Sequence, residues 1–202
     1  MIKAIAIIPA RGGSRRVPRK NIRDFCGRPM IEYAIETAKV SGLFDQVYVS
    51  TDDDEVEQIA RCAGAAIARR PWCDGTAGTQ TVAAEFLLRE VASKYSGNPA
   101  FACVIYPTTP LLLPSDLQTG FQALLSNPGA QFAMAVGGEP LADAGAYYWG
   151  WTSAFRAQIP LVAPHTVMVP LPPERVCDIN THVDWDRAVT LYQRMMGVTL
   201  ED

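Results

Sequence analysis

The chain has 202 residues, 49% of them hydrophobic, which is enough apolar material to bury the core of one domain. Its 18 basic and 21 acidic residues give a net charge of -3, which argues against a general nucleic-acid binder, because such proteins spread positive charge over a whole face. Five scattered cysteines without a C-x-x-C pair argue against a disulfide framework and a structural zinc site. The apolar runs are too short for a signal peptide or for the roughly 18 residues of a membrane span. We therefore expect a cytoplasmic protein that binds neither nucleic acid nor membrane.

Strands and helices are expected to alternate along most of the chain. Runs of apolar residues predict strands at residues 3–9, 46–51, 65–68, 101–106 and 131–136. Apolar residues at helical spacing predict helices at residues 28–42, 52–64, 78–94, 116–127 and 181–197. Asp52 with Glu55 resembles a capping box at the start of the second helix, and Ser115 is a candidate cap of the fourth. This order predicts an α/β fold, a Rossmann-like three-layer sandwich with a mostly parallel sheet, in which residues 1–202 form a single domain.

The stretch IIPARGGSRRVPRKN, residues 7–21, follows the first expected strand and is crowded with positive charge. Six of the chain's 18 basic residues lie within 13 positions here, with no acidic residue among them. Ligands of open α/β sheets bind outside the C-terminal ends of the strands, which is where this loop begins. Gly12 and Gly13 allow the main chain to approach an anion, and Arg11 and Lys20 add the charge that a triphosphate needs. The patterns G-x-x-x-x-G-K-[ST] and G-x-G-x-x-G are both absent, and the alternative is a surface loop whose arginines are merely solvated.

Five motifs occur along the chain in a fixed order, namely the loop at residues 7–21 and then VSTDD, YPTTP, DAGAYYW and DINTHVDW. In this order they are similar to the motifs of the acylneuraminate cytidylyltransferase family, whose members activate nonulosonic acids. The resemblance covers nearly the whole chain and implies a fold of the nucleotide-diphospho-sugar transferase type. It also implies that CMP is transferred from CTP to the anomeric hydroxyl of an acidic nine-carbon sugar, with pseudaminic acid favoured, and that pyrophosphate is released. Mg²⁺ is the cofactor that the resemblance implies.

Carried over position by position, the resemblance assigns roles to individual residues. It implies that the nucleotide is bound by Ala10, Arg11, Gly12, Gly13, Ser14, Lys20, Asn21, Arg70 and Thr108. It implies that the sugar is bound by Tyr106, Asp143 and Ala144. It implies that Mg²⁺ is held by Asp178 and Asn180. Phosphoryl transfer mainly needs positioning and the neutralisation of charge on phosphate oxygens, so the expected catalytic residues are Arg11, Lys20 and Asp178.

Several of these assignments have a structural alternative. The alternative for Arg70 is an ordinary arginine at the end of a strand, and for Thr108 it is a structural residue in a proline-rich turn. Asp52 also resembles a family position, but the role of a helix N-cap is sufficient for it. The aromatic residues of DAGAYYW are as often core residues as walls of a ligand site. Three further cations of the basic loop either bind the triphosphate or only steer anions toward it, namely Arg15, Arg16 and Arg19.

Two departures from the family pattern affect the metal and the sugar. Relatives usually carry a second aspartate where this chain has Asn180, which weakens the metal site without abolishing it, since Mg²⁺ needs only one or two carboxylates. Relatives also have a longer, protruding segment that helps to form a homodimer, where residues 137–143 make a short connection here. Either the natural protein has a deletion at this point, or a segment is missing from the sequence. The family therefore predicts a homodimer, and the short connection puts its interface in question.

Two other functions remain open at this point. A sugar-1-phosphate nucleotidylyltransferase has a similar loop but typically a Gly-Thr-Arg core, where this chain has Gly-Ser-Arg. A non-catalytic nucleotide-binding relative would keep the loop and would have lost turnover together with the second aspartate and the longer segment. The first function predicts a preference for another nucleotide over CTP, and the second predicts CTP binding without turnover.

Overall fold

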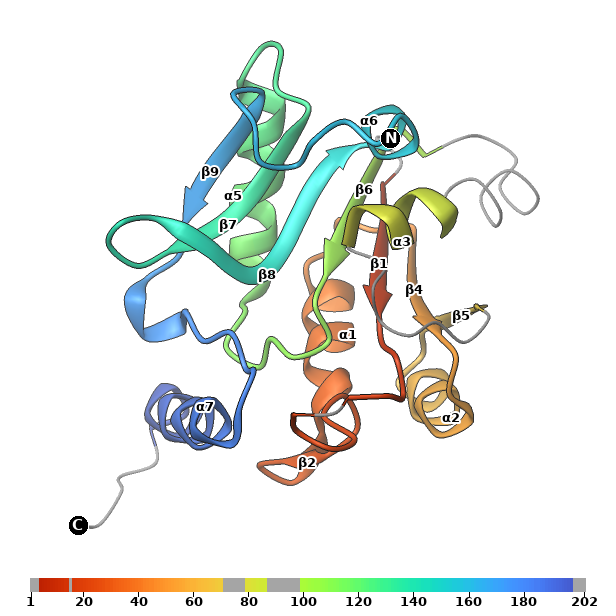
Figure 1. Ribbon diagram of the computed structural model, residues 1–202, viewed down its shortest axis with the longest axis vertical. Coiled ribbons are helices and arrows are strands. Elements are labelled where there is room, and N and C mark those ends of the chain that lie inside the picture. The colour runs from red at the N-terminus through yellow and green to blue at the C-terminus, as the bar shows by residue number, and fades with distance from the viewer. Residues whose placement is uncertain (1–3, 15, 71–78, 87–98, 198–202) are drawn as a thin grey trace.

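A seven-stranded sheet forms the centre of the molecule (Figure 1). The computed structural model describes residues 4–14, 16–70, 79–86 and 99–197. In spatial order the strands are β5 (Ala66–Arg69), β4 (Gln46–Thr51), β1 (Ala4–Pro9), β6 (Phe101–Ile105), β8 (Ala142–Trp151), β7 (Phe132–Gly137) and β9 (Thr166–Pro170). Strand β8 runs antiparallel to its neighbours β6 and β7, and the other adjacent pairs of these strands are parallel. The sheet is therefore mostly parallel, as the sequence predicts.

Helices cover both faces of this sheet. They are α1 (Met30–Val40), α2 (Asp54–Cys62), α3 (Thr79–Phe86), α5 (Pro114–Ser126), α6 (Thr152–Arg156) and α7 (His182–Met195), with a 3-10 turn η2 (Pro173–Arg175) and a small hairpin of β2 (Asp24–Phe25) and β3 (Arg28–Pro29). Successive residues of a strand face opposite sides. Ala6 and Ile8 of β1 accordingly pack with α1, α2 and α5, whereas Ile5 and Ile7 pack with α3 and α6. This confirms the three-layer, Rossmann-like architecture.

Helix α7 packs against the segment that follows β1. A separate hydrophobic cluster joins Val17, Phe25 and Tyr33 to Ile179 and Trp185. The ring of Phe25 lies edge to face with that of Trp185 at 5.4 Å and with that of Tyr33 at 5.6 Å, and such aromatic pairs stabilise beyond their burial. Figure 1 shows α7 near the edge of the sheet at which β1, β4 and β6 end. The cluster therefore fixes the residues directly before α7 next to the loop after β1.

Two expected helix caps are wrong by a small shift along the chain. Asp53, and not Asp52, caps α2 by accepting from two N–H groups of its first turn. Asp52 instead accepts from the N–H of Gly12 at 2.9 Å. Helix α5 begins at Pro114, so Ser115 lies inside its first turn. Proline suits this first position, because its fixed φ is helical and the missing N–H would have no partner there.

The second half of the chain is more regular than its sequence suggests. The motif DAGAYYW lies in the ten-residue strand β8. The sequence pattern does not predict β9, a short strand at the edge of the sheet that ends on Pro170. The helix expected at residues 78–94 is present as α3, and the rest of that range lies outside the described residues. No helix in the described parts of the chain is long and apolar enough to cross a membrane.

The short connection between β7 and β8 closes as a hairpin. Gly137 pairs directly with Ala142, so only residues 138–141 form the turn. Gly138 has a φ of 82°, a left-handed conformation that glycine adopts without strain. The two strands thus pair directly beside the turn, and their register shifts further along, between Met134 and Val136.

Candidate active site

The predicted site residues gather at the edge of the sheet where β1, β4, β5 and β6 end (Figure 1). The segments that follow β1, β5 and β6 carry residues 10–21, Arg70, Tyr106 and Thr108. Because β8 runs antiparallel to β6, its first residues lie at the same edge, and the Tyr106 N–H donates to the Ala146 carbonyl at 2.9 Å. The packing of α7 adds residues 178–180. This is the edge at which open α/β sheets bind ligands.

Ala10 and Asn21 anchor the two ends of the basic loop. Ala10 is fully buried, and its N–H donates to the Ser50 carbonyl at 2.9 Å. Asn21 is also buried, and its Nδ2 donates to the Arg11 carbonyl at 2.8 Å. The backbone carbonyl of Asn21 accepts from the Ile31 N–H at 2.8 Å. These contacts hold the ends of the loop together and leave the Arg11 side chain exposed, where it is accessible to an anion.

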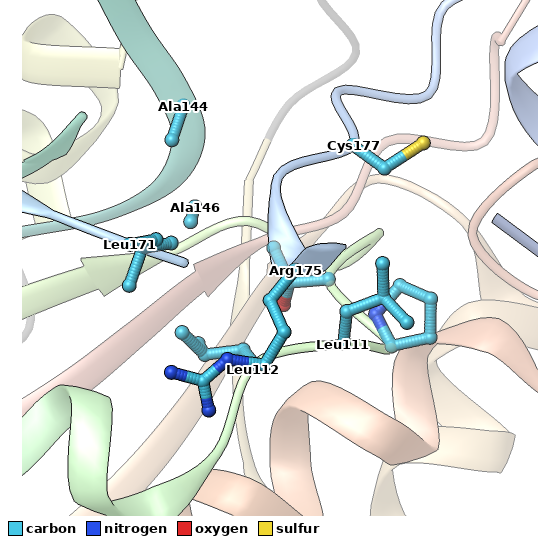
Figure 2. Close-up of a pocket in the computed structure, with 9 residues that line it drawn as sticks. Leu111, Leu112, Ala144, Ala146, Leu171, Arg175 and Cys177 are labelled. Atoms are coloured by element: carbon cyan, nitrogen blue, oxygen red, sulfur yellow. The ribbon is translucent and has the colours of Figure 1, made fainter. Parts of the chain in front are cut away.

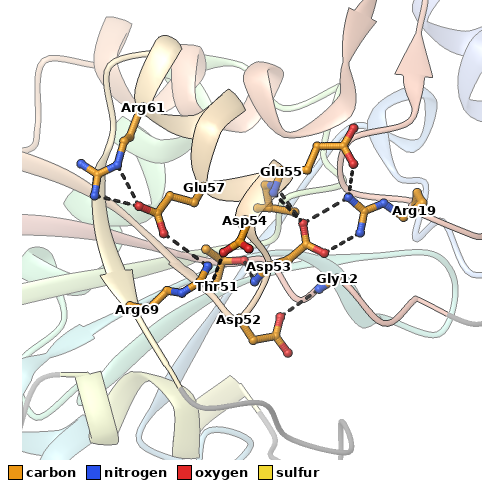
Figure 3. A network of polar contacts seen from close by, with 11 residues as sticks. Gly12, Arg19, Thr51, Asp52, Asp53, Asp54, Glu55, Glu57, Arg61 and Arg69 are labelled. Carbon is orange, nitrogen blue, oxygen red and sulfur yellow. Dashed lines mark hydrogen bonds and ion pairs between the residues drawn. The ribbon is translucent and has the colours of Figure 1, made fainter.

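Gly12 fits tightly against the carboxylates that follow β4 (Figure 3). Its N–H donates to Asp52 Oδ1 at 2.9 Å. A Cβ at Gly12 would lie 2.3 Å from Asp53 Oδ2, whereas a Cβ at Gly13 would have no atom within 4 Å. The close approach of Asp53 is therefore what requires glycine at position 12. Since the Gly12 N–H is already bonded inside the protein, we expect the Gly13 N–H and the Ser14 hydroxyl to be the donors that face an anion.

Arg19 is held by acidic residues at the start of α2 (Figure 3). Its guanidinium pairs with Asp53 at 2.5 Å and also with Glu55. The hydrogen bond from Arg19 is the main reason why the pKa of Asp53 is lowered, and the N–H groups that Asp53 caps lower it further. Arg19 thus stabilises the carboxylate that packs on Gly12, which is a structural role. Arg15, another of the three arginines whose role the sequence left open, lies outside the described residues.

We expect Gly12→Ala to lower the free energy of unfolding by about 1–3 kcal/mol, because Asp53 must move away from Arg19 and from the start of α2 to admit a methyl group. Gly13→Ala is the matched control and should change this free energy by less than about 0.5 kcal/mol. Urea unfolding of both variants measures the difference. Equal stability of the two would contradict the packing of Gly12 on Asp53.

Two cations of the basic loop contact the segment before α7. The Lys20 ammonium donates to the Ile179 carbonyl, and Arg16 Nη2 donates to Asn180 Oδ1 at 2.7 Å. Asn180 Nδ2 in turn donates to Asp178 Oδ2 at 2.6 Å. Desolvation lowers the pKa of Lys20, and the nearby Asp178 carboxylate opposes this shift. Three predicted site residues therefore lie together, and Arg16 joins them.

Asp178 is suited to hold a hard cation. Its side chain is exposed and lies against Gly145, where a Cβ would be 3.1 Å from Asp178 Cγ. The φ of Gly145 is 59°, so glycine both permits this backbone and leaves room for the carboxylate. The described residues contain no group of three or more His, Cys, Asp or Glu side chains that could hold a metal. The single carboxylate of Asp178 still fits Mg²⁺, because this ion needs only one or two carboxylates beside water and phosphate oxygens.

Asp143 is held in place at the start of β8. The Tyr148 hydroxyl donates to Asp143 Oδ2 at 2.6 Å, and the Gly145 N–H donates to Asp143 Oδ1 at 2.9 Å. Burial raises the pKa of Tyr148, so its phenol stays protonated and remains a donor. The rings of Tyr106 and Tyr148 lie 5.5 Å apart. Two of the predicted sugar-binding residues are therefore linked through Tyr148, which sequence reasoning missed because neighbouring aromatic residues in one strand carry no signal of which face they occupy.

A small pocket opens beside Ala144, the third predicted sugar-binding residue (Figure 2). The pocket is lined by Thr109, Pro110, Leu111, Leu112, Ala144, Ala146, Leu171, Arg175 and Cys177. Arg175 pairs with Asp116 at 2.8 Å, and both side chains are mostly buried. The pair ties the chain shortly before Asp178 to the start of α5. It joins positions 59 residues apart, so no local pattern in the sequence indicates it.

Arg70 and Thr108 are buried to different degrees at the same edge. The Arg70 N–H donates to the Thr51 carbonyl at 3.0 Å. Its Nε is buried without a hydrogen-bond partner among the described residues, and an acceptor from a ligand would stabilise such a donor. Thr108 is buried in the turn after β6, which agrees with a structural role. Nucleotide contacts of both residues stay predictions.

Comparison with known proteins identifies the family. A family model described as "Cytidylyltransferase" matches residues 5–147, and the chain therefore belongs to the cytidylyltransferase family. It is 31% identical to the pseudaminic acid cytidylyltransferase of Campylobacter jejuni subsp. jejuni serotype O:2, with 95% of this chain and 97% of the relative covered. The resemblance stated from the motifs is thereby confirmed.

Solved structures support the fold. The chain is similar to CMP:2-keto-3-deoxy-manno-octonic acid synthetase complexed with CTP, at a TM-score of 0.73 and 19% identity, with 96% of this chain and 99% of that chain covered. It is also similar to Rv0371c from Mycobacterium tuberculosis H37Rv in complex with manganese, at a TM-score of 0.67 and 12% identity, with 93% and 98% covered. The chain therefore shares its fold with these two structures.

The alignment with the Campylobacter relative contains positions that this chain lacks. It extends over 227 positions, whereas the chain has 202 residues, so at least 25 aligned positions have no residue here. The motifs predict a shortened connection at residues 137–143, and its place in the alignment stays a prediction. The direct hairpin between β7 and β8 lies where the motifs predict that shortening.

Proposed function

We propose that this protein transfers CMP from CTP to the anomeric hydroxyl of a nonulosonic acid, with pseudaminic acid as the favoured sugar. Similarity over nearly the full length of a pseudaminic acid cytidylyltransferase supports this reaction. The observation that carries the proposal is the contact of Lys20 and Arg16 with residues 178–180 at the edge of the sheet, where Lys20 lies near the Asp178 carboxylate and Arg16 donates to Asn180. A triphosphate needs cations and its metal needs a carboxylate, and this cluster offers both.

The chain's own residues bind and orient the triphosphate. In the proposed reaction the sugar's hydroxyl oxygen attacks the α-phosphorus of CTP and loses its proton to solvent. The bond from that phosphorus to the bridging oxygen breaks, and pyrophosphate leaves with the electron pair. Arg11 and Lys20 neutralise charge on the phosphate oxygens, and the Gly13 N–H and Ser14 hydroxyl donate hydrogen bonds to them. Arg70 and Thr108 are the proposed further contacts of the nucleotide.

Mg²⁺ is the proposed cofactor, held by Asp178 together with phosphate oxygens of CTP. When bound, it supplies positive charge to the phosphoryl group that is transferred. Lys20 lies beside the same carboxylate. In this proposal Lys20 and the metal ligand Asp178 therefore both act on the phosphates of CTP.

The sugar is proposed to lie against Tyr106, Asp143 and Ala144. Asp143 is exposed, and two donors fix its carboxylate, so it can accept hydrogen bonds from sugar hydroxyl or amide N–H groups without first being ordered. The small side chain of Ala144 borders the pocket of Figure 2. The Tyr106 ring offers an apolar face to the sugar ring.

Pyrophosphate release tests the proposal. CTP is incubated with pseudaminic, legionaminic or N-acetylneuraminic acid, with Mg²⁺ or with EDTA, and we expect the highest kcat/KM with pseudaminic acid and no turnover in EDTA. The absence of turnover with all three sugars at high enzyme concentration would sink the proposal. A preference for UTP, GTP or dTTP would favour a sugar-1-phosphate nucleotidylyltransferase. CTP binding without product would identify a non-catalytic relative.

We further propose that the protein works as a homodimer in the cytoplasm, following the expectation from its family. Light scattering of the purified protein measures the oligomeric state. A fully active monomer would contradict the dimer and would mean that the hairpin between β7 and β8 replaces the longer segment without loss of turnover.

A further inference from the structure

The side-chain amide of Asn180 bridges a carboxylate and a guanidinium. Its Nδ2 donates to Asp178 Oδ2 at 2.6 Å, and its Oδ1 accepts from Arg16 Nη2 at 2.7 Å. Only a group that carries both a donor and an acceptor can bond these two partners at once. An ionised aspartate at this position has no donor for Asp178. The bridge therefore depends on the residue at which this chain departs from the pattern of its relatives.

The oxygen of Asn180 is poorly placed for a metal ion, because it faces a guanidinium. The surroundings carry more positive than negative charge. The charges of Arg16 and Arg11 act on Lys20, and Asp178 opposes them. The remaining nearby carboxylate, Asp184, completes the capping box of α7 and accepts from the N–H groups of residues 180 and 181. Lys20, Arg16 and Arg11 thus outnumber the carboxylates of Asp178 and Asp184 around the Lys20 ammonium, a balance that favours a polyanion over a free divalent cation.

We propose that Asn180 is a positioning residue that fixes the Asp178 carboxylate and directs Arg16 toward the triphosphate, and that the divalent metal binds together with CTP and not before it. This inference rests on the proposed function, and it replaces the expectation that Asn180 is itself a metal ligand. Arg16 becomes a nucleotide-binding residue through Asn180. A residue that only ordered the loop would not affect both metal binding and nucleotide binding.

CTP binding without metal tests the link between Asn180 and Arg16. Calorimetry in EDTA on the whole protein should show that Asn180→Ala and Arg16→Gln each weaken CTP binding by about 3- to 10-fold, the order of one net hydrogen bond at an exposed site. The double variant should be no weaker than the weaker single variant, because both changes break one bridge. Unchanged metal-free affinity in Asn180→Ala, or losses that multiply in the double variant, would overturn the inference.

Mn²⁺ binding to the CTP-free protein tests the role assigned to the metal. We measure free Mn²⁺ by electron paramagnetic resonance. The Asn180→Asp variant should bind Mn²⁺ about 10-fold more tightly than the wild type, because a second carboxylate replaces the amide. Asn180→Ala should show no loss relative to the wild type. A loss in Asn180→Ala would identify Asn180 as a ligand, and no gain in Asn180→Asp would remove the charge argument, so either result overturns the inference.

Two control variants and the wild type keep the outcomes separate. Asn127→Ala removes an amide that donates to the Ala123 carbonyl at 2.7 Å in α5, and Arg61→Gln removes an exposed arginine paired within α2. Neither should change CTP or Mn²⁺ binding, and thermal unfolding confirms that each variant is folded. A wild type that binds CTP without turnover contradicts the proposed function and leaves this inference standing. If the wild type is active but Asn180→Ala binds CTP as well as the wild type does, the proposed function stands and this inference is overturned. A wild type that does not bind CTP overturns both.

Discussion

Asp178→Asn is expected to lower kcat at saturating Mg²⁺ by about a hundredfold or more, the order of magnitude by which loss of one charge-stabilising group slows a transfer reaction. The substitution preserves the shape of the side chain beside Gly145 and removes the charge that we propose holds the metal. Among the carboxylates near Lys20, Asp184 is committed to the cap of α7 and cannot take its place. Initial rates of pyrophosphate release over a range of Mg²⁺ concentrations measure the effect.

The same variant should bind CTP almost normally in EDTA, within about threefold of the wild type, since the cations of the loop remain. Asp186→Asn, an exposed aspartate on α7, is the matched control and should leave kcat unchanged. If Asp178→Asn lost CTP affinity and kcat in equal measure, Asp178 would act on nucleotide binding and not on the metal.

Lys20→Ala is expected to lower kcat/KM for CTP by about a hundredfold, because it removes a partly buried cation that we propose neutralises the triphosphate and that water replaces poorly. It also removes the bond to the Ile179 carbonyl that holds the loop against residues 178–180. Lys20→Arg should recover part of the loss, since the charge returns with a different geometry. Steady-state kinetics with varied CTP at fixed sugar measure both variants.

Lys39→Ala is the control for the loss of a lysine bonded to the backbone. Lys39 Nζ donates to the Ala63 carbonyl at 3.0 Å, well away from the basic loop along the chain. Its removal should leave kcat/KM for CTP within about twofold of the wild type. Equal losses in Lys20→Ala and Lys39→Ala would show that tethering of the backbone, and not charge at the nucleotide, is what Lys20 provides.

Sequence periodicity was enough to predict the elements that bury a continuous run or stripe of apolar residues. The apolar run at residues 3–9 and the helical spacing after the basic loop predict β1 and α1, since both elements bury a continuous apolar set. The cap of α2 could not be chosen, because Asp52, Asp53 and Asp54 are adjacent and each is a competent N-cap. In the structure Asp52 is not the cap, because it accepts a hydrogen bond from the Gly12 N–H. That contact spans 40 residues of sequence.

The sequence predicts which residues belong to the candidate site, but it does not predict the hydrogen bonds between them. The motifs indicate Lys20, Asp178 and Asn180, because charged residues after strands and before helices have few structural uses together. The role of Arg16 depends on a side-chain bond across 164 residues, and spacing along the chain carries no record of such a bond. The same holds for Tyr148, whose hydroxyl turns back to Asp143 across an irregular part of β8.

The packing of α7 on the segment after β1 also sets the order in which activity can arise during synthesis. A growing chain presents its N-terminal part first, and that part can begin to fold before the rest exists. The basic loop therefore emerges long before Asn180, its partner 164 positions later. A nascent chain that stops before Asp178 already carries the basic loop, the proposed binding site of the triphosphate, but lacks the carboxylate proposed to hold the metal. The basic loop and Asp178, to which we assign the nucleotide and the metal, come together only when the aromatic rings of Phe25 and Trp185 have met.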